Sequence, residues 1–261
     1  MKKLTIALML LLSPFAAMNA QKKSADIAPG LKGYFKAMEG ATATPDDQGF
    51  IRRWMLLEPI SKPNSSNRVL VDSYVRENLT KQYFKKQGIL DLKKLPKDGD
   101  KETVEMQVQA PVNLNQGRPS PGAQNNQPKM EKVKLQWHAL DSELFNIKLF
   151  RFATGLDKTR YGVIFWGYTI VECDEDMENV RLAVGTNKGS IWYVNGEELI
   201  MLASDRHMNV DSAVSKRITL KKGKNIVWFG LINGPSMSDF CCRFLDENGN
   251  PIKNLKISVN N

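Results

Sequence analysis

LAVGTNKGSIWYVNGEEL, residues 182–199, contains the clearest indication of how this chain folds. Two β-prone runs flank a turn, and the second run ends at Asn195-Gly196. Because Asn-Gly is a favoured pair for a two-residue type I′ hairpin, we expect strand 190–194 to turn directly into strand 197–202. Asn195 is therefore interpreted as a turn residue, since asparagine tolerates positive φ.

Trp192 and Tyr193 stand next to each other just before that turn. Successive side chains of a strand point to opposite faces of the sheet, so one ring should face the core and the other should face outward. This alternation disfavours a ligand platform built from both rings.

The same kind of pattern continues on both sides of this hairpin. FIRRWMLLEPI, residues 50–60, is interpreted as an early strand, and short β-prone runs follow one another from Val133 onward, with Gly, Asn and Asp turns between them. The later runs are KLQWHAL, LFNIKLFRF, YGVIFWGYTIVEC, VRLAVG, SIWYVNGEELIML, SKRITLKKGKNIVWFGLI and DFCCRFLDENGNPI. The spacing predicts a mainly β fold, an antiparallel β-sandwich of jelly-roll type.

Three other segments complete the predicted organisation. Apolar spacing predicts a helix over 71–88, inserted into one sandwich domain that covers 48–257. The stretch 96–130 is rich in Pro, Gly, Asn and Gln and is predicted to be a long, disordered, mobile loop. The N-terminal segment 21–47 allows a short helix around Leu31–Met38.

Residues 1–20 have the form of a secretory signal peptide. A basic start, Met1-Lys2-Lys3, precedes an apolar run that is too short for a permanent membrane span, and small residues follow up to Ala20. We therefore expect a bacterial protein that is exported to the periplasm or beyond, without a transmembrane segment.

The charge and the cysteines exclude several classes of protein. The chain of 261 residues carries a formal net charge of +9, but its lysines are scattered and do not form a stripe with aromatics, which argues against a nucleic-acid partner. The cysteines are Cys173, Cys241 and Cys242. After export Cys173 could bridge to Cys241 or Cys242, and no C-x-x-C spacing suggests a metal or redox site.

No complete catalytic motif is found, and we predict no catalytic residue. Ser236 lies near a G-x-S-x-G pattern without matching it, and a strand follows where a nucleophile elbow needs a helix. Ser236 or Ser238, His207 and Asp205 or Asp211 have the residue types of a catalytic triad, but no sequence motif links them. The acidic turns 174–176 and 246–250 could supply oxygen ligands to a structural calcium, but neither has EF-hand spacing, so no metal or cofactor is predicted.

The order of four features resembles a known family. They are Trp54–Pro59, the aromatic strand Tyr161–Val171, the pair Val180–Gly185 and Ile191–Glu197, and Leu220–Asn225 leading to Phe240–Leu245. This order is similar to that of galactose-binding-like jelly-roll accessory domains of secreted polysaccharide-degrading enzymes, such as glycoside hydrolases and acetylxylan-type esterases. The resemblance implies that strand 50–60 pairs into the later sandwich. Relatives often carry acidic residues where this chain has Thr186-Asn187-Lys188.

The resemblance implies a non-catalytic module that binds a polysaccharide or oligosaccharide at the loop rim of the sandwich. An aromatic face would stack on a sugar while polar side chains bind its hydroxyls, and the candidate ligand-binding residues are Trp192, Asn187, Glu197, Arg206 and Asp239. Two alternatives stay open. One is a carbohydrate esterase-related protein, and the other is a structural module that docks on a partner enzyme or envelope protein.

Overall fold

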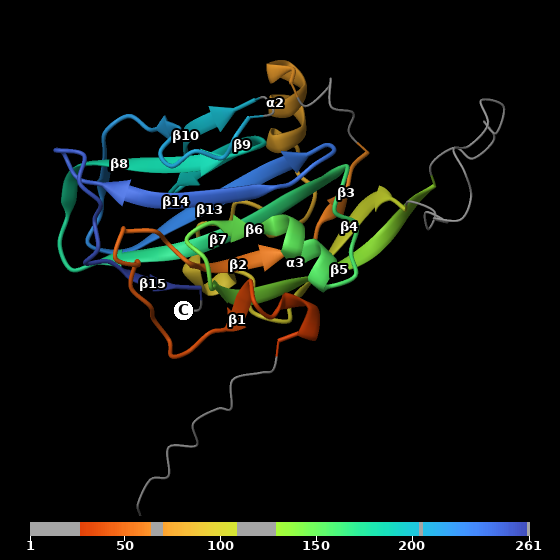
Figure 1. Ribbon diagram of the computed structural model, residues 1–261, viewed down its shortest axis with the longest axis horizontal. Helices are drawn as coiled ribbons and strands as arrows, with labels where there is room; N and C mark the ends of the chain where they lie inside the picture. The colour runs from red at the N-terminus through yellow and green to blue at the C-terminus, as the bar shows by residue number, and fades with distance from the viewer. Residues whose placement is uncertain (1–26, 64–69, 109–128, 204–205, 260–261) are drawn as a thin grey trace, which may run out of the picture.

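The computed structural model describes residues 27–63, 70–108, 129–203 and 206–259. Two antiparallel sheets pack face to face as a β-sandwich (Figure 1), and every strand pair between described residues is antiparallel. The mainly β sandwich predicted from the turn spacing is confirmed. The predicted signal peptide, 1–20, lies outside the described residues.

The larger sheet has the strand order β1-β5-β2-β7-β13-β9-β10, with β3 and β15 also paired to β7 and β4 paired to β5. Its strands are β1 (Phe35–Ala37), β2 (Arg53–Leu57), β3 (Ile60–Ser61), β4 (Lys101–Gln107), β5 (Met130–Ser142), β7 (Val163–Cys173), β9 (Gly189–Val194), β10 (Glu197–Leu202), β13 (Gly223–Asn233) and β15 (Lys256–Ser258). The early strand β2 pairs with both β5 and β7, as expected for a strand that completes the later sandwich.

The smaller sheet has the order β11-β8-β14-β6, with β12 also paired to β8. Its strands are β6 (Ile147–Lys148), β8 (Met177–Thr186), β11 (Ala213–Val214), β12 (Ile218–Leu220) and β14 (Asp239–Leu245). The helical elements are η1 (Pro29–Leu31), α2 (Asp72–Thr80), η2 (Leu92–Lys94) and α3 (Leu149–Gly155).

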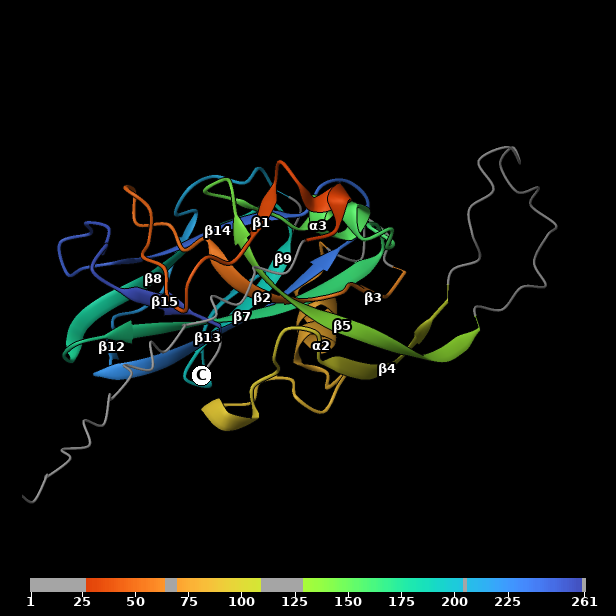
Figure 2. The ribbon, with the colours of Figure 1, turned by 90° about the horizontal axis from the view of Figure 1, so that it is seen from below.

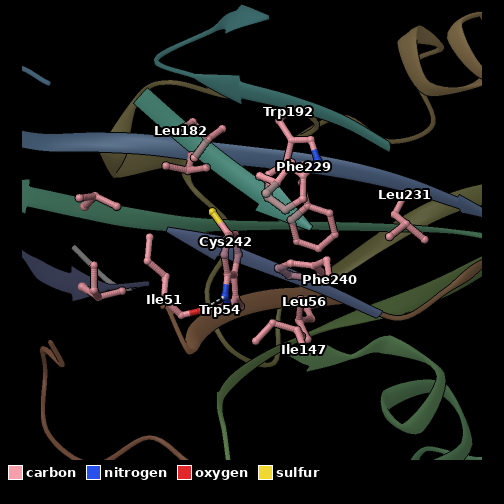
Figure 3. Close-up of a cluster of buried hydrophobic side chains, with 14 of the residues drawn as sticks. Ile51, Trp54, Leu56, Ile147, Leu182, Trp192, Phe229, Leu231, Phe240 and Cys242 are labelled. Atoms are coloured by element: carbon pink, nitrogen blue, oxygen red, sulfur yellow. Dashed lines mark hydrogen bonds between the residues drawn. The ribbon is translucent and has the colours of Figure 1, made fainter. Parts of the chain in front are cut away.

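The core between the two sheets is an aromatic cluster (Figure 3). Trp54 lies edge-on to both Phe229 and Phe240, with ring centroids 5.4 and 5.1 Å away. Trp192 stacks on Phe229 at 5.2 Å and is fully buried. Rings contributed by β2, β9, β13 and β14 thus join the two sheets, and burial of their large apolar surface is the main source of stability.

A second apolar cluster covers the opposite face of the larger sheet. Figure 2 shows that α2 and the chain that follows it lie on the side of this sheet away from β8 and β14. We call α2 and the chain that follows it the cover. Phe84 in the cover packs edge-on against Trp137 and Trp166, at 5.7 and 6.3 Å between ring centroids. The larger sheet is therefore buried on both faces, which explains the continuous burial along β7.

The hairpin predicted at Asn195-Gly196 is confirmed. The strands β9 and β10 pair directly across it, and both turn residues have positive φ, 49° for Asn195 and 84° for Gly196. The predicted alternation also holds, because Trp192 faces the core while Tyr193 on the other face is only partly buried.

The helix predicted over 71–88 is shorter than expected, since α2 ends at Thr80 and Lys81 is extended. Two glutamines satisfy backbone groups that a longer helix would have used. The Gln87 carboxamide accepts from Tyr83 N at 2.9 Å, and Gln82 donates to Phe84 O at 2.6 Å. Such side-chain bonds compete with the helical ladder.

Three other expectations need correction. The run 144–152 is not one strand, because only Ile147–Lys148 form the short β6 and α3 begins at Leu149. The helix expected around 31–38 is the short η1 followed by strand β1. Part of the predicted loop 96–130 is the regular strand β4, which pairs with β5 along its whole length. Residues 109–128 of that loop lie outside the described part of the chain.

The cysteines form no disulfide. All three thiols are free and buried, Cys242 in the core between the sheets and Cys173 near the end of β7. Cys241 and Cys242 point to opposite faces of β14, where Cys241 Sγ packs over Gly185. Within the ranges that the structure describes, no helix is long and apolar enough to cross a membrane.

Candidate functional site

One end of the sandwich brings together three of the predicted site residues. Asn187, in the turn between β8 and β9, accepts through Oδ1 from the backbone N of Asp239 at 2.9 Å. The backbone N of Arg206 donates to Asn187 O at 3.2 Å. These residues are far apart in the sequence, and the turn at Asn187 holds them at one rim.

A buried ion pair lies beneath this rim. Lys148 Nζ lies 2.6 Å from Asp239 Oδ2, and the Asp239 side chain is only 5% exposed. Asp239 Oδ1 and the neighbouring Ser238 Oγ are buried, and neither has a hydrogen-bond partner among the described residues. Because a buried carboxylate needs a cation, this pair fixes the start of α3 against β14.

Exposed and half-buried side chains near the ion pair form an alternating row of rings and cations. We call Tyr34, Arg151, Phe150, Arg160 and Tyr161 the rim ladder. The Arg151 guanidinium carbon is 4.8 Å from the Tyr34 ring centroid and 5.7 Å from that of Phe150. The Arg160 guanidinium carbon is 4.9 Å from the Phe150 centroid and 5.0 Å from that of Tyr161. Cation–π attraction favours this alternation.

Backbone contacts hold the rim ladder in place. Phe150 N donates to Ser238 O at 3.2 Å, which ties α3 to the chain before β14. Asn233 Nδ2 donates to Arg160 O at 2.8 Å and also contacts Ser236 O at 3.3 Å. The loop after α3 is thereby joined to the loop that follows β13. These hydrogen bonds connect Phe150 and Arg160 of the ladder to the end of β13 and to the chain before β14.

The charge of the rim ladder is uncompensated. Arg151 and Arg160 are both exposed, and no ion pair between described residues involves either of them. Tyr161 is 42% exposed, so its ring is accessible from solvent. The arrangement offers aromatic faces for stacking and two planar forks of N–H donors that match carboxylates.

Two predicted site residues lie elsewhere. Trp192 is fully buried between Phe229, Trp54 and Phe240, so its ring presents no face to a sugar. The prediction that Trp192 binds a ligand at the rim is therefore wrong, because Trp192 lies on the face of β9 that points into the core. Glu197 pairs with Lys216 in an open pocket of about 590 Å³ beside the Asn195 hairpin. Neither residue joins the Asn187 cluster.

The residues considered for catalysis are not assembled into a triad. Ser238 Oγ has no hydrogen-bond partner among the described residues, and His207 is exposed. Asp211 is held by Arg243, whose guanidinium binds both of its carboxylate oxygens. Asp205 lies outside the described residues.

The carboxylates of the acidic turns bind lysines and backbone N–H groups. Asp174 pairs with Lys256 at 2.7 Å and Asp176 with Lys221 at 3.0 Å. Asp246 Oδ1 accepts from the backbone N of Asn248 and of Asn250, at 2.9 and 2.7 Å. In the part of the chain that the structure describes, no group of three or more His, Cys, Asp or Glu side chains could hold a metal ion.

The rim ladder was missed by sequence reasoning for a specific reason. The run that contains Phe150 and Arg151 was interpreted as a strand, which would send these neighbours to opposite faces. The pairs Phe150-Arg151 and Arg160-Tyr161 were the available signal, since each places a cation beside a ring.

Comparisons with known proteins add little to this geometry. No family model matches the chain, and no curated protein matches it. A selenomethionine-labelled β-glucosidase from Kluyveromyces marxianus is 20% identical, with a TM-score of 0.29 over 50% of this chain and 14% of its own. The same β-glucosidase in complex with glucose is 19% identical, with a TM-score of 0.28 over 49% and 15%. The likeness to a glycoside hydrolase is thus weak and covers about half of this chain and a small part of the enzyme. At this TM-score it carries no argument.

Proposed function

We propose that this chain is an exported, non-catalytic accessory module that binds polysaccharide at the rim ladder. The observation that carries the proposal is a row in which the exposed ring of Tyr161 and the half-buried rings of Tyr34 and Phe150 alternate with two exposed arginines. Neither arginine has a carboxylate partner among the described residues. Sugar rings present C–H faces to aromatic side chains, and their hydroxyls and carboxylates accept from guanidinium groups. The predicted signal peptide and the resemblance to galactose-binding-like accessory domains support the same proposal.

The charge of the site narrows the class of glycan. Two guanidinium groups in one row, without an ion-pair partner among the described residues, favour a polymer that carries carboxylates, such as one rich in uronic acids. The net charge of +9 also attracts anionic polymers over longer distances. Binding at the rim should therefore weaken as salt is added.

Affinity electrophoresis of the chain from residue 21 tests this proposal. The gels would contain polygalacturonate, alginate, xylan or galactan, and we expect retardation to be strongest on the acidic polymers. The double variant Arg160→Ala/Tyr161→Ala should weaken the affinity about tenfold, the loss expected for one binding hot spot.

The single variant Arg160→Ala is compared with Arg217→Ala as its matched control, because Arg217→Ala also removes one exposed arginine but lies outside the rim ladder. Equal losses for the two arginine variants would indicate non-specific attraction and would contradict a site at the rim. A chain that none of the four polymers retards would contradict the proposed function on this panel.

A further inference from the structure

A separate pocket lies between the larger sheet and the segment that follows α2. It has a volume of about 190 Å³, and its walls include Trp166, Trp228, Tyr193, Thr80, Gln82 and Gln87. These residues come from three neighbouring strands, β7, β13 and β9, and from the cover. The pocket shares no residue with the rim ladder.

Register explains why the rings meet at this place. Trp228 is directly opposite Tyr193 in the pairing of β13 with β9, and Gly230 is opposite Trp166 in the pairing of β13 with β7. A Cβ at Gly230 would lie 2.9–3.1 Å from the Trp166 ring, so the indole lies flat over this glycine. The absence of a side chain at Gly230 thus allows Trp166 to lie beside Trp228.

The two indoles differ in their hydrogen bonding. Trp228 Nε1 donates to Ile89 O at 3.0 Å, in the cover. Trp166 is only 2% exposed, and its Nε1 has no hydrogen-bond partner among the described residues. Buried indole N–H groups normally find an acceptor, and leaving one without a partner is unfavourable. Trp166 Nε1 is thus an unused donor on a residue that lines the pocket.

The polar groups of the cover supply complementary acceptors. The Thr80 hydroxyl donates to Arg76 O at 2.8 Å and keeps its lone pairs for a second partner. Gln82 uses its amide nitrogen for Phe84 O, which leaves its Oε1 to accept. A ligand with several hydroxyl groups could bond to both while it accepts from the indole.

Size and charge limit the ligand further. The pocket is small, with a volume of about 190 Å³, and fits a ligand of about one six-membered ring. No ionisable acid or base other than the Tyr193 phenol lines the pocket. Burial raises the pKa of that phenol, so the group is neutral at ordinary pH.

We propose that this pocket binds a single uncharged pyranose ring, such as the terminal residue of a glycan. The aromatic walls pack on its C–H faces, Trp166 Nε1 donates to one of its oxygens, and Thr80 and Gln82 accept from its hydroxyls. This second site deepens the proposed function, because it would select a neutral ring where the rim selects carboxylates. It does not require the rim to be functional.

Isothermal titration calorimetry with single sugars tests the pocket without involving polymers. The probes are the methyl β-pyranosides of glucose, xylose and galactose, with glucuronate as the charged comparison. We expect at least one neutral pyranoside to bind and glucuronate to bind more weakly. Thr80→Phe, at the exposed end of α2, places a ring at the mouth and should reduce the affinity at least tenfold.

Glu77→Phe is the matched control, because it adds the same ring to the exposed surface of α2 outside the pocket. Trp166→Phe keeps an aromatic wall but removes the donor, and it should also weaken binding about tenfold. Retardation of the same variants on polygalacturonate should be unchanged. That result would separate failure of the pocket from failure of the rim.

Three results would overturn the proposal. One is that no neutral pyranoside binds to the wild-type chain. Another is that Thr80→Phe and Glu77→Phe have the same affinity, and the third is that glucuronate is the preferred sugar. The proposed function could survive each of these results if acidic polymers still bind at the rim ladder.

Discussion

The rim ladder and the pocket beneath α2 differ in how much their binding side chains contribute to the folded core. In the ladder both arginines and the Tyr161 ring are exposed, while the Lys148–Asp239 pair that supports them contains a buried carboxylate. In the pocket the two tryptophans are themselves part of the apolar cluster that joins the cover to the sheet. Binding and folding therefore share the same side chains in the pocket, whereas at the rim different side chains serve the two purposes.

This difference has a general consequence for mutagenesis. Exposed residues away from caps and buried networks usually change stability by less than about 0.5 kcal/mol. Changes to buried aromatic or charged groups are several times larger. Variants can thus remove rim binding from a stable protein, whereas most pocket variants need a measurement of stability beside every measurement of binding.

The largest effect is expected at the support of the rim. Lys148→Met leaves Asp239 buried without its cation, which should lower the free energy of unfolding by about 3 kcal/mol. Urea unfolding followed by tryptophan fluorescence measures this change. Lys148→Met/Asp239→Asn should recover most of the loss. A single variant as stable as the wild type would show that the pair does not support the rim.

A smaller effect is expected at Gly230, beneath the pocket. Gly230→Ala forces the Trp166 ring away from β13 and should lower the free energy of unfolding by about 2 kcal/mol through overpacking. Because the ring forms one wall, binding of methyl pyranosides should be lost while retardation on polygalacturonate remains. Loss of both activities together would mean that the two sites are not independent.

Tyr83 offers a test of the cover that uses pH. Burial raises the pKa of its phenol above the usual value near 10, and the hydroxyl has no hydrogen-bond partner among the described residues. Above about pH 10 the unfolded chain releases this proton and the folded chain retains it, so the free energy of unfolding falls as pH rises.

Tyr83→Phe should make this alkaline loss shallower and should leave stability at pH 7 equal or higher by about 1 kcal/mol, since an unpaired hydroxyl is removed. Denaturant unfolding at a series of pH values from 7 to 11 measures both effects. If the variant and the wild type lose stability with the same slope above pH 10, the buried position of this phenol is contradicted.

The smallest effect on stability is expected at the exposed end of the ladder. Tyr161→Ala should change the free energy of unfolding by no more than about 0.5 kcal/mol. The same variant should reduce retardation by acidic glycans. A large loss of stability in this variant would remove the contrast between the two regions, because it would make the ring part of the fold.

The sequence predicted those features whose cause is local. Asn195-Gly196 specifies a hairpin because both residues accept positive φ, and the flanking runs were the right length to pair. The early strand around Trp54 could be assigned for a similar reason, since its apolar run had to find a partner in the later sheets.

Features that depend on distant residues were predicted less well. The run containing Phe150 forms α3, whose first residues are anchored by Ser238 O and by the Lys148–Asp239 pair. Local β-propensity cannot anticipate such contacts, because the partners follow about 90 residues later. The end of α2 at Thr80 could not be predicted from apolar spacing either, since glutamine side chains replace the helical hydrogen bonds after that residue.

Trp192 shows both kinds of feature, one with a local cause and one that depends on distant residues. The order of residues alone places Trp192 and Tyr193 on opposite faces of one strand, because the side-chain period of a strand is two. Which of the two rings is buried depends on how the two sheets pack together. Phe229, Phe240 and Trp54 enclose Trp192 from three other strands, and burial of those four rings together fixes which face of β9 turns inward.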